Sequence, residues 1–268
     1  MSGPLLPFRI IFAILLAPAL VMVWVGFYPS GCLALVPVAA MAVVIFSYYW
    51  ACNAVRARLI ADLYFERGAL FNIIMFSRIR LLLGGLVYTV SLTAFLAFTA
   101  VMWGETAVLL LAADALVVFL LLMLFRSLAR GALRATDDLA PIIARQFAAR
   151  VNAVLLTGAL TWLALNSAPP DYATGQDSLR GALGAAAQGP FSQCGWIDTL
   201  VSWGRQVDAL KWWTMTQATG QLSSPDLVLG AWLLFLLSGG VAALGFSVLA
   251  VQINHVVLGW DGGRNDHV

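Results

Sequence analysis

The chain has 268 residues, of which 62% are hydrophobic and only 10% are charged. Soluble globular proteins are about a quarter charged, so this composition excludes a water-soluble globule and indicates a polytopic membrane protein. The formal net charge is only +2, and the charged residues gather in a few stretches between long uncharged runs.

Six stretches are long and apolar enough to cross a membrane, since about 20 apolar residues span a hydrocarbon core of about 30 Å. They are residues 7–28, 32–50, 81–103, 106–125, 151–167 and 227–251. The fifth is diluted by Asn152, Thr157, Thr161 and Asn166, so we expect it to face protein rather than lipid. The chain is therefore predicted to form a single all-α membrane domain with six transmembrane helices.

The positions of the basic residues predict the orientation. Ten of the 15 Lys and Arg residues lie in residues 51–80 and 126–150, on the same side of the membrane. Basic residues beside the ends of spans are retained in the cytoplasm, so both loops and both termini are predicted to be cytoplasmic. One lysine against fourteen arginines favours a GC-rich bacterial genome, and hence the inner (cytoplasmic) membrane.

The first span could be confused with a cleaved secretory signal, because a short basic start precedes it. Gly31-Cys32 is also similar to a lipoprotein cleavage site, but Pro29 stands where such a site has a branched apolar residue. A second apolar span follows at once. We therefore expect the first helix to remain uncleaved.

Residues 51–80 are predicted to form a cytoplasmic helical loop. Arg58, Asp62 and Glu66 are four residues apart, which favours an exposed continuation of the second helix. Residues 69–77 are apolar but too short to cross, and arginines flank them on both sides. We expect this stretch to lie in the headgroup plane.

Residues 126–150 form the second predicted cytoplasmic loop. Arg126, Arg130 and Arg134 recur every four residues and so share one helical face, which could contact anionic headgroups or an acidic partner. The pair Asp137-Asp138 could bind a metal, but a helix start before Pro141 explains it better. Retention of arginine in the cytoplasm explains both basic loops, so no nucleic-acid binding is predicted.

Residues 168–225 are the one sizeable segment on the outer side. An apolar stripe at spacings of three and four predicts an amphipathic helix here. The stripe consists of Trp196, Leu200, Trp203, Val207, Leu210 and Trp213. Tryptophan prefers the headgroup level, so we expect the helix to lie along the interface, with Trp196, Trp203 and Trp213 touching lipid or a partner. It could be a linker on the lipid, a lid over a central cavity or a docking face.

Asp114 is the most informative single residue, because it falls near the middle of the fourth span. Apart from Arg9 at the very start of the first span, no Lys or Arg lies in any predicted span to neutralise it, so it should face the bundle and find a partner or stay protonated. The candidate partners are Tyr88, Thr89, Ser91, Thr93, Thr157, Thr161 and Ser238. Two interpretations stay open: a site for a proton or cation, and a hydrogen-bonded packing residue.

Small residues cluster in the third and sixth spans. They are Gly84 and Gly85 in one, and Ser238, Gly239, Gly240, Ala243 and Gly245 in the other. Such residues permit close helix packing. A helix broken at Gly239-Gly240, as in some transporters, is the alternative.

The three cysteines allow one candidate disulfide. Cys32 and Cys194 are both predicted on the outer, oxidising side, whereas Cys52 is predicted at the cytoplasmic end of its helix. Their separation in space cannot be judged from sequence, so free thiols remain the alternative.

The residues that catalysis or cofactor binding would need are missing. The two histidines, His255 and His267, are both near the C-terminus, which leaves no basis for a haem or a histidine-ligated metal site. The sequence also lacks a P-loop, a Gly-x-Ser-x-Gly motif, a His-Glu-x-x-His motif and a Cys-x-x-Cys motif. We expect no catalytic residue, no cofactor and no metal.

Two functional classes remain, and an embedded enzyme ranks behind both. The first is a non-catalytic membrane subunit of a bacterial secretion, conjugation or multi-subunit transport assembly, contacting lipids and other membrane subunits. The missing catalytic groups, the cytoplasmic helical loops and the outer amphipathic helix favour it. The alternative is a small transporter or channel that uses Asp114 as a buried carboxylate.

Overall fold

The computed structural model describes residues 6–64, 78–103, 105–131, 139–167, 170–172, 176, 178–188, 191–220 and 225–259. Within these residues the protein is all helical and has no strand. Six helices are long and apolar enough to span a membrane, which confirms the expected class of multi-pass membrane protein. The candidate spans among the described residues are Pro7–Ser30, Cys32–Val55, Ile79–Met102, Thr106–Gly131, Ala140–Leu165 and Phe235–Val257.

The first two long helices, α1 (Leu6–Phe27) and α2 (Leu35–Tyr64), are joined by two short 3₁₀ turns on either side of Gly31. Gly31 has a φ of 147°, a backbone conformation that glycine adopts at little cost and other residues rarely adopt. The chain continues through α4 (Arg78–Met102), α5 (Glu105–Gly131) and α6 (Ala140–Leu165). Two further helices, α7 (Leu179–Ala186) and α8 (Gly195–Gly220), precede the last, α9 (Pro225–Val257).

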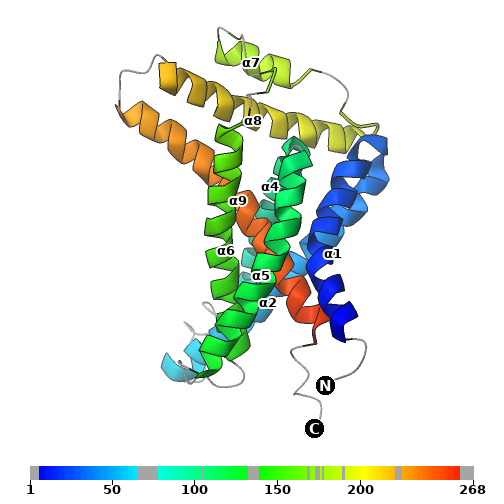
Figure 1. The fold of residues 1–268 in the computed structure, drawn as a ribbon, viewed down its shortest axis with the longest axis vertical. Helices are drawn as coiled ribbons and strands as arrows, with labels where there is room; N and C mark the ends of the chain where they lie inside the picture. The colour runs from blue at the N-terminus through cyan, green and yellow to red at the C-terminus, as the bar shows by residue number, and fades with distance from the viewer. Residues whose placement is uncertain are drawn as a thin grey trace.

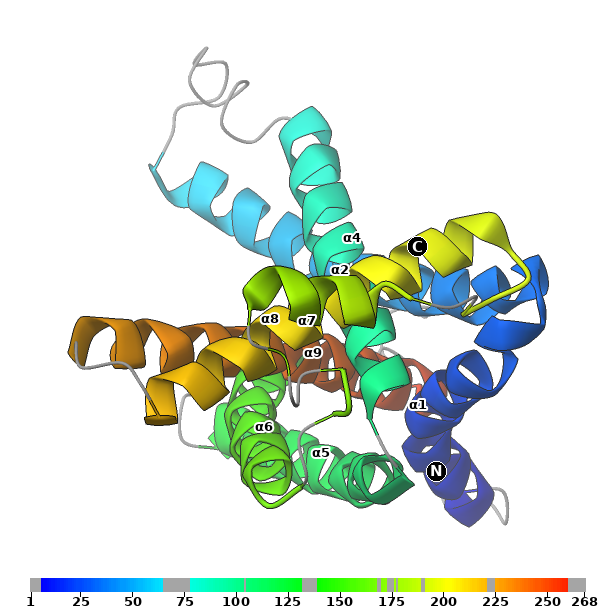
Figure 2. The same ribbon diagram turned by 90° about the horizontal axis from the view of Figure 1, so that it is seen from above.

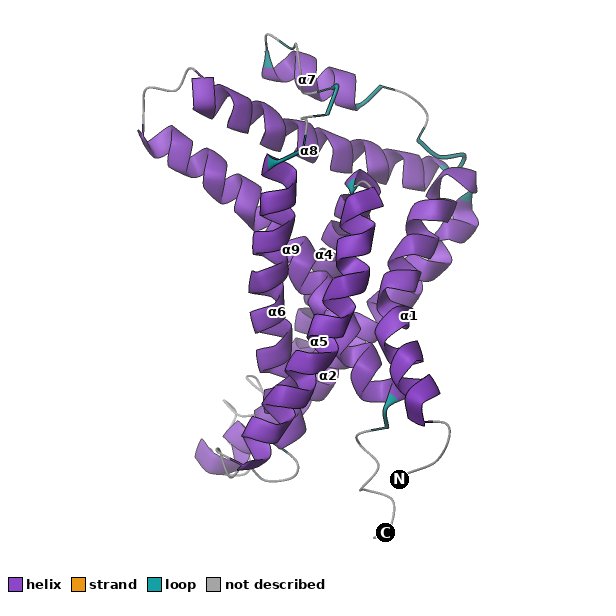
Figure 3. Cartoon of the chain, viewed as in Figure 1, coloured by secondary structure: helices purple, strands orange, loops and turns teal. Residues whose placement is uncertain are grey.

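The helices form an upright bundle with a cap (Figure 1). The start of α1 and the end of α9 lie at one end of the bundle, here called the terminal end. Helices α7 and α8, here called the cap, lie at the opposite end, where α8 crosses over the upright helices. Figure 3, coloured by secondary structure, shows helices and loops but no strand in the described residues.

Helix α9 is the centre of the bundle. It packs against α1, α2, α4, α5, α6 and α8. Seen from above, it runs obliquely beneath α8, with α5 and α6 on one side and α2 and α4 on the other (Figure 2). From Phe246 to His255 every residue of α9 is buried, so this part of the helix touches protein all round.

Helix α6 begins earlier than the sequence pattern indicates. It begins at Ala140, before the expected position 151, with Pro141 in its first turn, where the missing N–H costs no hydrogen bond. Arg145 and Arg150 therefore lie within the apolar helix Ala140–Leu165. This corrects the expectation that no Arg beyond Arg9 lies within a span. The sequence pattern places all five arginines of residues 126–150 in a cytoplasmic loop, whereas the structure places Arg145 and Arg150 in α6.

Helices α2 and α5 continue beyond their predicted spans, as expected for helical loops at residues 51–80 and 126–150. Helix α2 continues to Tyr64 and α5 to Gly131, both past the end of the apolar run. The stretch 69–77, Arg134 and the pair Asp137-Asp138 lie outside the described residues.

Close helix contact depends on particular glycines. A Cβ atom at Gly245 would lie 2.9 Å from the backbone oxygen of Leu92, and one at Gly85 would lie 2.9 Å from the Phe46 ring. In contrast, nothing lies within 4 Å of a Cβ built on Gly239, and α9 runs unbroken through Gly239 and Gly240. Gly245 and Gly85 thus bring the helices together, while Gly239 leaves space open.

The contact at Gly245 makes a stability prediction. Gly245→Ala should lower the melting temperature of the purified protein, because the backbones of α4 and α9 must separate, at a cost of about 1–3 kcal/mol. Gly158→Ala is the matched control, since a Cβ there meets nothing within 4 Å. Thermal unfolding in detergent measures both variants. Equal melting temperatures for the two would contradict the assigned contact.

Candidate functional site

Asp114 lies on the packed side of α5. It is only 7% exposed, and Leu111, Ala115 and Val118, which lie within about one turn of it, are buried as well. Residues three and four apart share a helical face, so the same face that packs α5 against the bundle carries the carboxylate inward. The expectation that Asp114 faces protein rather than lipid agrees with this position.

The partner of Asp114 is Asn152 of α6, which is fully buried. The Asn152 amide nitrogen donates to the Asp114 carboxylate at 2.8 Å and to the Ser247 hydroxyl of α9 at 2.9 Å. Ser247 in turn donates to the backbone oxygen of Ala243 at 2.7 Å. Asp114, Asn152 and Ser247 therefore form a polar junction that joins three helices.

One atom of this junction lacks a partner. The side-chain oxygen of Asn152 is buried and accepts no hydrogen bond within the described residues. Burying an acceptor in this way costs about 1–3 kcal/mol. A charged carboxylate cannot fill the gap, because it only accepts, whereas a protonated Asp114 could donate to this oxygen. After a small rotation, acid and amide would exchange two hydrogen bonds, so the junction can satisfy protonated Asp114 more completely than charged Asp114.

A second buried polar cluster surrounds Arg145 of α6, toward the terminal end. Arg145 is 5% exposed and donates to the side-chain oxygen of Gln252 on α9 at 3.3 Å and to the backbone oxygen of Pro141 at 3.2 Å. Gln252 donates to the Ser47 hydroxyl of α2 at 3.1 Å. No carboxylate contacts Arg145 among the residues that the structure places. The cluster thus holds a buried positive charge through neutral groups.

The two clusters belong to one line of polar side chains between α6 and α9. Toward the cap, Thr157 of α6 faces Gly240 of α9, since a Cβ on that glycine would lie 3.6 Å from the threonine oxygen. Further toward the cap, Thr161 of α6 and Ser238 of α9 both line a cavity that lies between these helices, α4 and α8. We call this line the polar seam. It comprises Arg145, Asn152, Thr157 and Thr161 of α6, Ser238, Ser247 and Gln252 of α9, and Asp114 and Ser47 beside them.

The cap carries a polar network of its own. Tyr172 donates to the Asp208 carboxylate at 2.6 Å, and Lys211 forms an ion pair with the same carboxylate. Burial raises the pKa of Tyr172 above its usual value, and the negative charge of Asp208 raises it further. The tyrosine therefore stays protonated as a donor. The Arg205 guanidinium lies 4.8 Å from the centre of the Tyr172 ring, which adds a cation–π contact.

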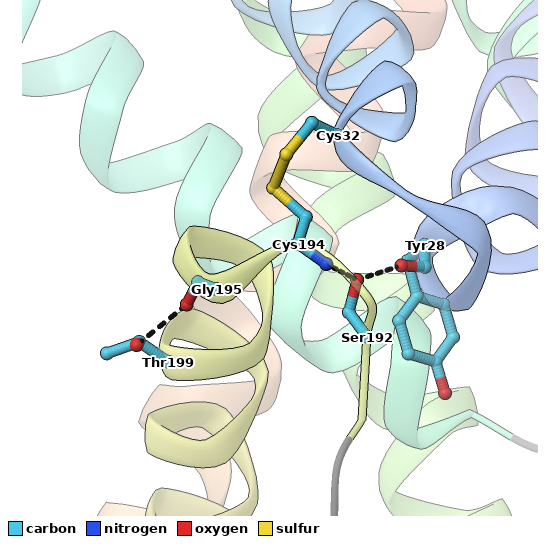
Figure 4. The surroundings of a disulfide bond; sticks show 6 residues. All are labelled: Tyr28, Cys32, Ser192, Cys194, Gly195 and Thr199. Carbon is cyan, nitrogen blue, oxygen red and sulfur yellow. Dashed lines mark hydrogen bonds between the residues drawn. A yellow bond between two sulfur atoms is a disulfide. The ribbon is translucent and has the colours of Figure 1, made fainter.

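Covalent and polar contacts fix the cap to the bundle (Figure 4). Cys32, just before α2, and Cys194, just before α8, form a disulfide with a Cα–Cα distance of 5.0 Å. Beside it, the Ser192 hydroxyl donates to the backbone oxygen of Tyr28 at 2.6 Å. The structure thus joins the two cysteines that the sequence left as a candidate pair, and Cys52 is a buried free thiol.

The predicted tryptophan stripe of α8 is exposed over part of its length. Trp196 and Trp203 are 79% and 61% exposed, and Val207 is exposed beside them. Trp213 is only half-exposed, and its indole N–H is buried without an acceptor in the described part of the chain. A different face of α8, which includes Ile197, packs inward.

Two of the three predicted arginine contacts can be placed. Arg126 is half-buried and Arg130 exposed near the end of α5, at the terminal end of the bundle. Neither residue contributes to the polar seam.

The described residues contain no group of three or more His, Cys, Asp or Glu side chains that could hold a metal ion. Comparison with known proteins finds no relative, since no protein family, curated protein or solved structure matches the chain. The function therefore has to be argued from the geometry.

Sequence reasoning found Asp114 but missed its partner. Neither Asn152 nor Ser247 was among the expected partners, although Asn152 was recognised as unusual in an apolar span. A usable signal was present on α6, where Arg145 and Asn152 are seven residues, or about two turns, apart and so share one face of the helix. Such a polar stripe on an apolar helix predicts a face turned toward protein.

The disulfide makes a labelling prediction. In membranes denatured without reductant, a maleimide of high mass should add once to the protein, at Cys52, and three times after reduction. The measurement is the mass shift on a gel. Cys32→Ser should free Cys194, which adds one label without reductant, whereas Cys52→Ser should remove the only label. Three labels on the unreduced protein would contradict the bond.

Proposed function

We propose that the protein is a membrane transport protein in which the polar seam carries a proton, with Asp114 as the group that binds and releases it. The observation that carries this proposal is the pairing of a buried carboxylate with an amide that has an unused acceptor. Ionisable groups buried inside membrane helices are rare and costly, and by default they are candidates for ion or proton pathways.

The extent of the seam supports this function. From Arg145 to Thr161, α6 rises about 24 Å, which is most of a hydrocarbon core about 30 Å thick. Polar side chains on α6 and α9 recur along this length, although a packing role would require only one tie between the helices. Such ties contribute about 0.6–2 kcal/mol each in membranes.

Arg145 favours a carrier over an open channel. Its permanent positive charge sits in the seam on the terminal side of Asp114, and a fixed guanidinium repels free cations. A proton held as neutral aspartic acid carries no such charge. We infer that Asp114 exchanges its proton with one side at a time, as the contacts of Asn152 and Ser247 rearrange.

The orientation proposed for this transporter places the terminal end in the cytoplasm and the cap outside, in a bacterial inner membrane. Arg80 near the start of α4 and Arg130 near the end of α5 lie at the terminal end, and arginine beside spans is retained inside. The disulfide at the cap needs an oxidising compartment, which the periplasm supplies. In this orientation α8 lies at the outer interface.

A second candidate function is a non-catalytic subunit of a larger secretion, conjugation or transport assembly. One observation favours it specifically: Trp196 and Trp203 project from a helix that a disulfide holds in place. Rigid, exposed tryptophans are typical anchors of protein interfaces. The two functions are compatible, because a proton-carrying subunit can belong to an assembly.

Proton flux through vesicles tests the first function. Purified protein in proteoliposomes with an internal pH dye should take up protons under an imposed potential faster than empty vesicles. Asp114→Asn should reduce uptake to the empty-vesicle rate, since the amide still accepts from Asn152 but cannot titrate. Asp198→Asn is the control, because this cap residue accepts backbone N–H groups and lies away from the seam.

The folding of Asp114→Asn is checked by its melting temperature, and Asp114→Glu should keep part of the uptake. Wild-type uptake no faster than that of empty vesicles, or full uptake by a folded Asp114→Asn protein, would overturn the assignment.

Crosslinking in intact cells tests the assembly function. The double variant Trp196→Ala/Trp203→Ala should lose a crosslinked membrane partner that the wild type retains, because truncating interface anchors costs about 2 kcal/mol or more each. Trp162→Ala is the control, since Trp162 is equally exposed but lies on α6. Recovery of wild-type protein with no partner, or equal recovery from all variants, would contradict a docking role for this face.

A further inference from the structure

A cavity of about 540 Å³ lies beneath α8, between α4, α6 and α9. It occupies the cap side of the bundle, in the region below α8 in Figure 1. Binding pockets for small molecules are typically about 300–1,000 Å³, so the space suffices for a ligand. Two residues of the polar seam, Thr161 and Ser238, and the exposed Trp203 are among the residues that line it.

The cavity has mainly apolar and aromatic walls. Phe95 and Phe98 of α4, Trp203 and Trp212 of α8 and Phe235 of α9 line it. Below them, Gly239 leaves space that any larger side chain would fill. The walls therefore fit a flexible hydrocarbon chain.

One end of the cavity is charged. Lys211 and Asp208 of α8 both line it and form an ion pair with each other. Lys211 also lies over the Phe235 ring, 5.1 Å from its centre, so the ammonium group lies close to the apolar walls. The pair offers a positive and a negative group side by side and has no net charge. This arrangement complements a zwitterion better than a singly charged anion.

The cavity is not fully enclosed. Phe95, Trp203 and Val207 line it and are exposed in the described structure. Trp203 belongs to the exposed stripe of α8, and indole rings prefer the headgroup level of a bilayer. A lipid of the outer leaflet could therefore insert a chain sideways while its headgroup stays near α8.

We propose that this cavity binds one acyl chain of a zwitterionic phospholipid, with the phosphate at Lys211 and the ammonium group at Asp208. The proposal goes beyond the proton-carrying function and does not depend on it. An acyl chain gains no hydrophobic energy by leaving the bilayer, so selectivity must come from the headgroup and from contacts with the cavity walls.

The experiment uses the full chain in nanodiscs of mixed phosphatidylethanolamine and phosphatidylglycerol. A trace of phosphatidylethanolamine with a photoreactive diazirine near the end of one acyl chain is added, and mass spectrometry locates the crosslinks. We expect the crosslinks to concentrate on cavity residues of α4, α8 and α9. Crosslinks spread evenly over the lipid-facing surface would overturn the proposal.

Two matched variants separate the cavity from the general surface. Gly239→Leu places a side chain in the cavity and should reduce crosslinking there by about fivefold or more, since little free volume remains for the chain. Gly158→Leu adds the same side chain where a Cβ has open space, away from the cavity, and should leave the pattern unchanged. Melting temperatures establish that both variants are folded. Unchanged crosslinking in folded Gly239→Leu would overturn the site.

The headgroup assignment has its own readout. A phosphatidylglycerol probe with the same photoreactive chain should crosslink to the cavity less than the phosphatidylethanolamine probe. Asp208→Asn should abolish this difference, because the partner of the ammonium group is lost. Equal labelling by both probes in the wild type would overturn the zwitterion assignment, and a difference that survives in Asp208→Asn would overturn the role of Asp208.

Discussion

The hydrocarbon core of a membrane contains no water to satisfy a polar side chain, so each buried polar group must find its partner within the protein. In this bundle that constraint acts most strongly between α6 and α9. Asn152 meets it by donating to two other helices at once, and Arg145 meets it through Gln252 and a backbone oxygen. The rotation of α6 about its axis is therefore determined by hydrogen bonds as well as by packing, since turning it would leave Asp114 without its donor.

Helix α9 can occupy the centre because its small residues and its polar residues serve different contacts. Gly245 admits the backbone of α4, while Ser247, two residues on, faces α6. Toward the cap, Gly239 and Gly230 of α9 make no close contact. The cavity lies beside this part of α9, between α4, α6 and α8. The disulfide joins the start of α8 to the turn before α2, so α8 is held over the cap end of the bundle, where residues of α8 line the cavity.

Much of the fold followed from apolar length alone, because a run of about 20 apolar residues has few alternatives to a spanning helix. The role of Asp114 as a buried group was also predictable, since a carboxylate in such a run must turn away from lipid. Its partner, Asn152, was not among the seven candidate residues, because which polar side chain meets Asp114 depends on how α4, α5, α6 and α9 are rotated against one another. The sequence pattern places Arg145 in a loop because arginine usually flanks spans, and this residue is an exception to that rule. Pro141 in the first turn of α6 was the signal that the helix starts earlier.

The proposed proton site rests on the side-chain oxygen of Asn152, a buried acceptor without a donor, which costs about 1–3 kcal/mol. The side-chain oxygen of Asn254 is also buried without a donor among the described residues, so what sets Asn152 apart is the carboxylate beside it. Here the missing donor is the proton that Asp114 lacks when it is charged. When charged, Asp114 leaves the Asn152 oxygen unpaired; when neutral, it can donate to that oxygen while its own carbonyl oxygen accepts from the Asn152 amide, which requires a small rotation. The two forms therefore favour different arrangements of α5 against α6, which is the minimum that a proton-driven change of conformation requires.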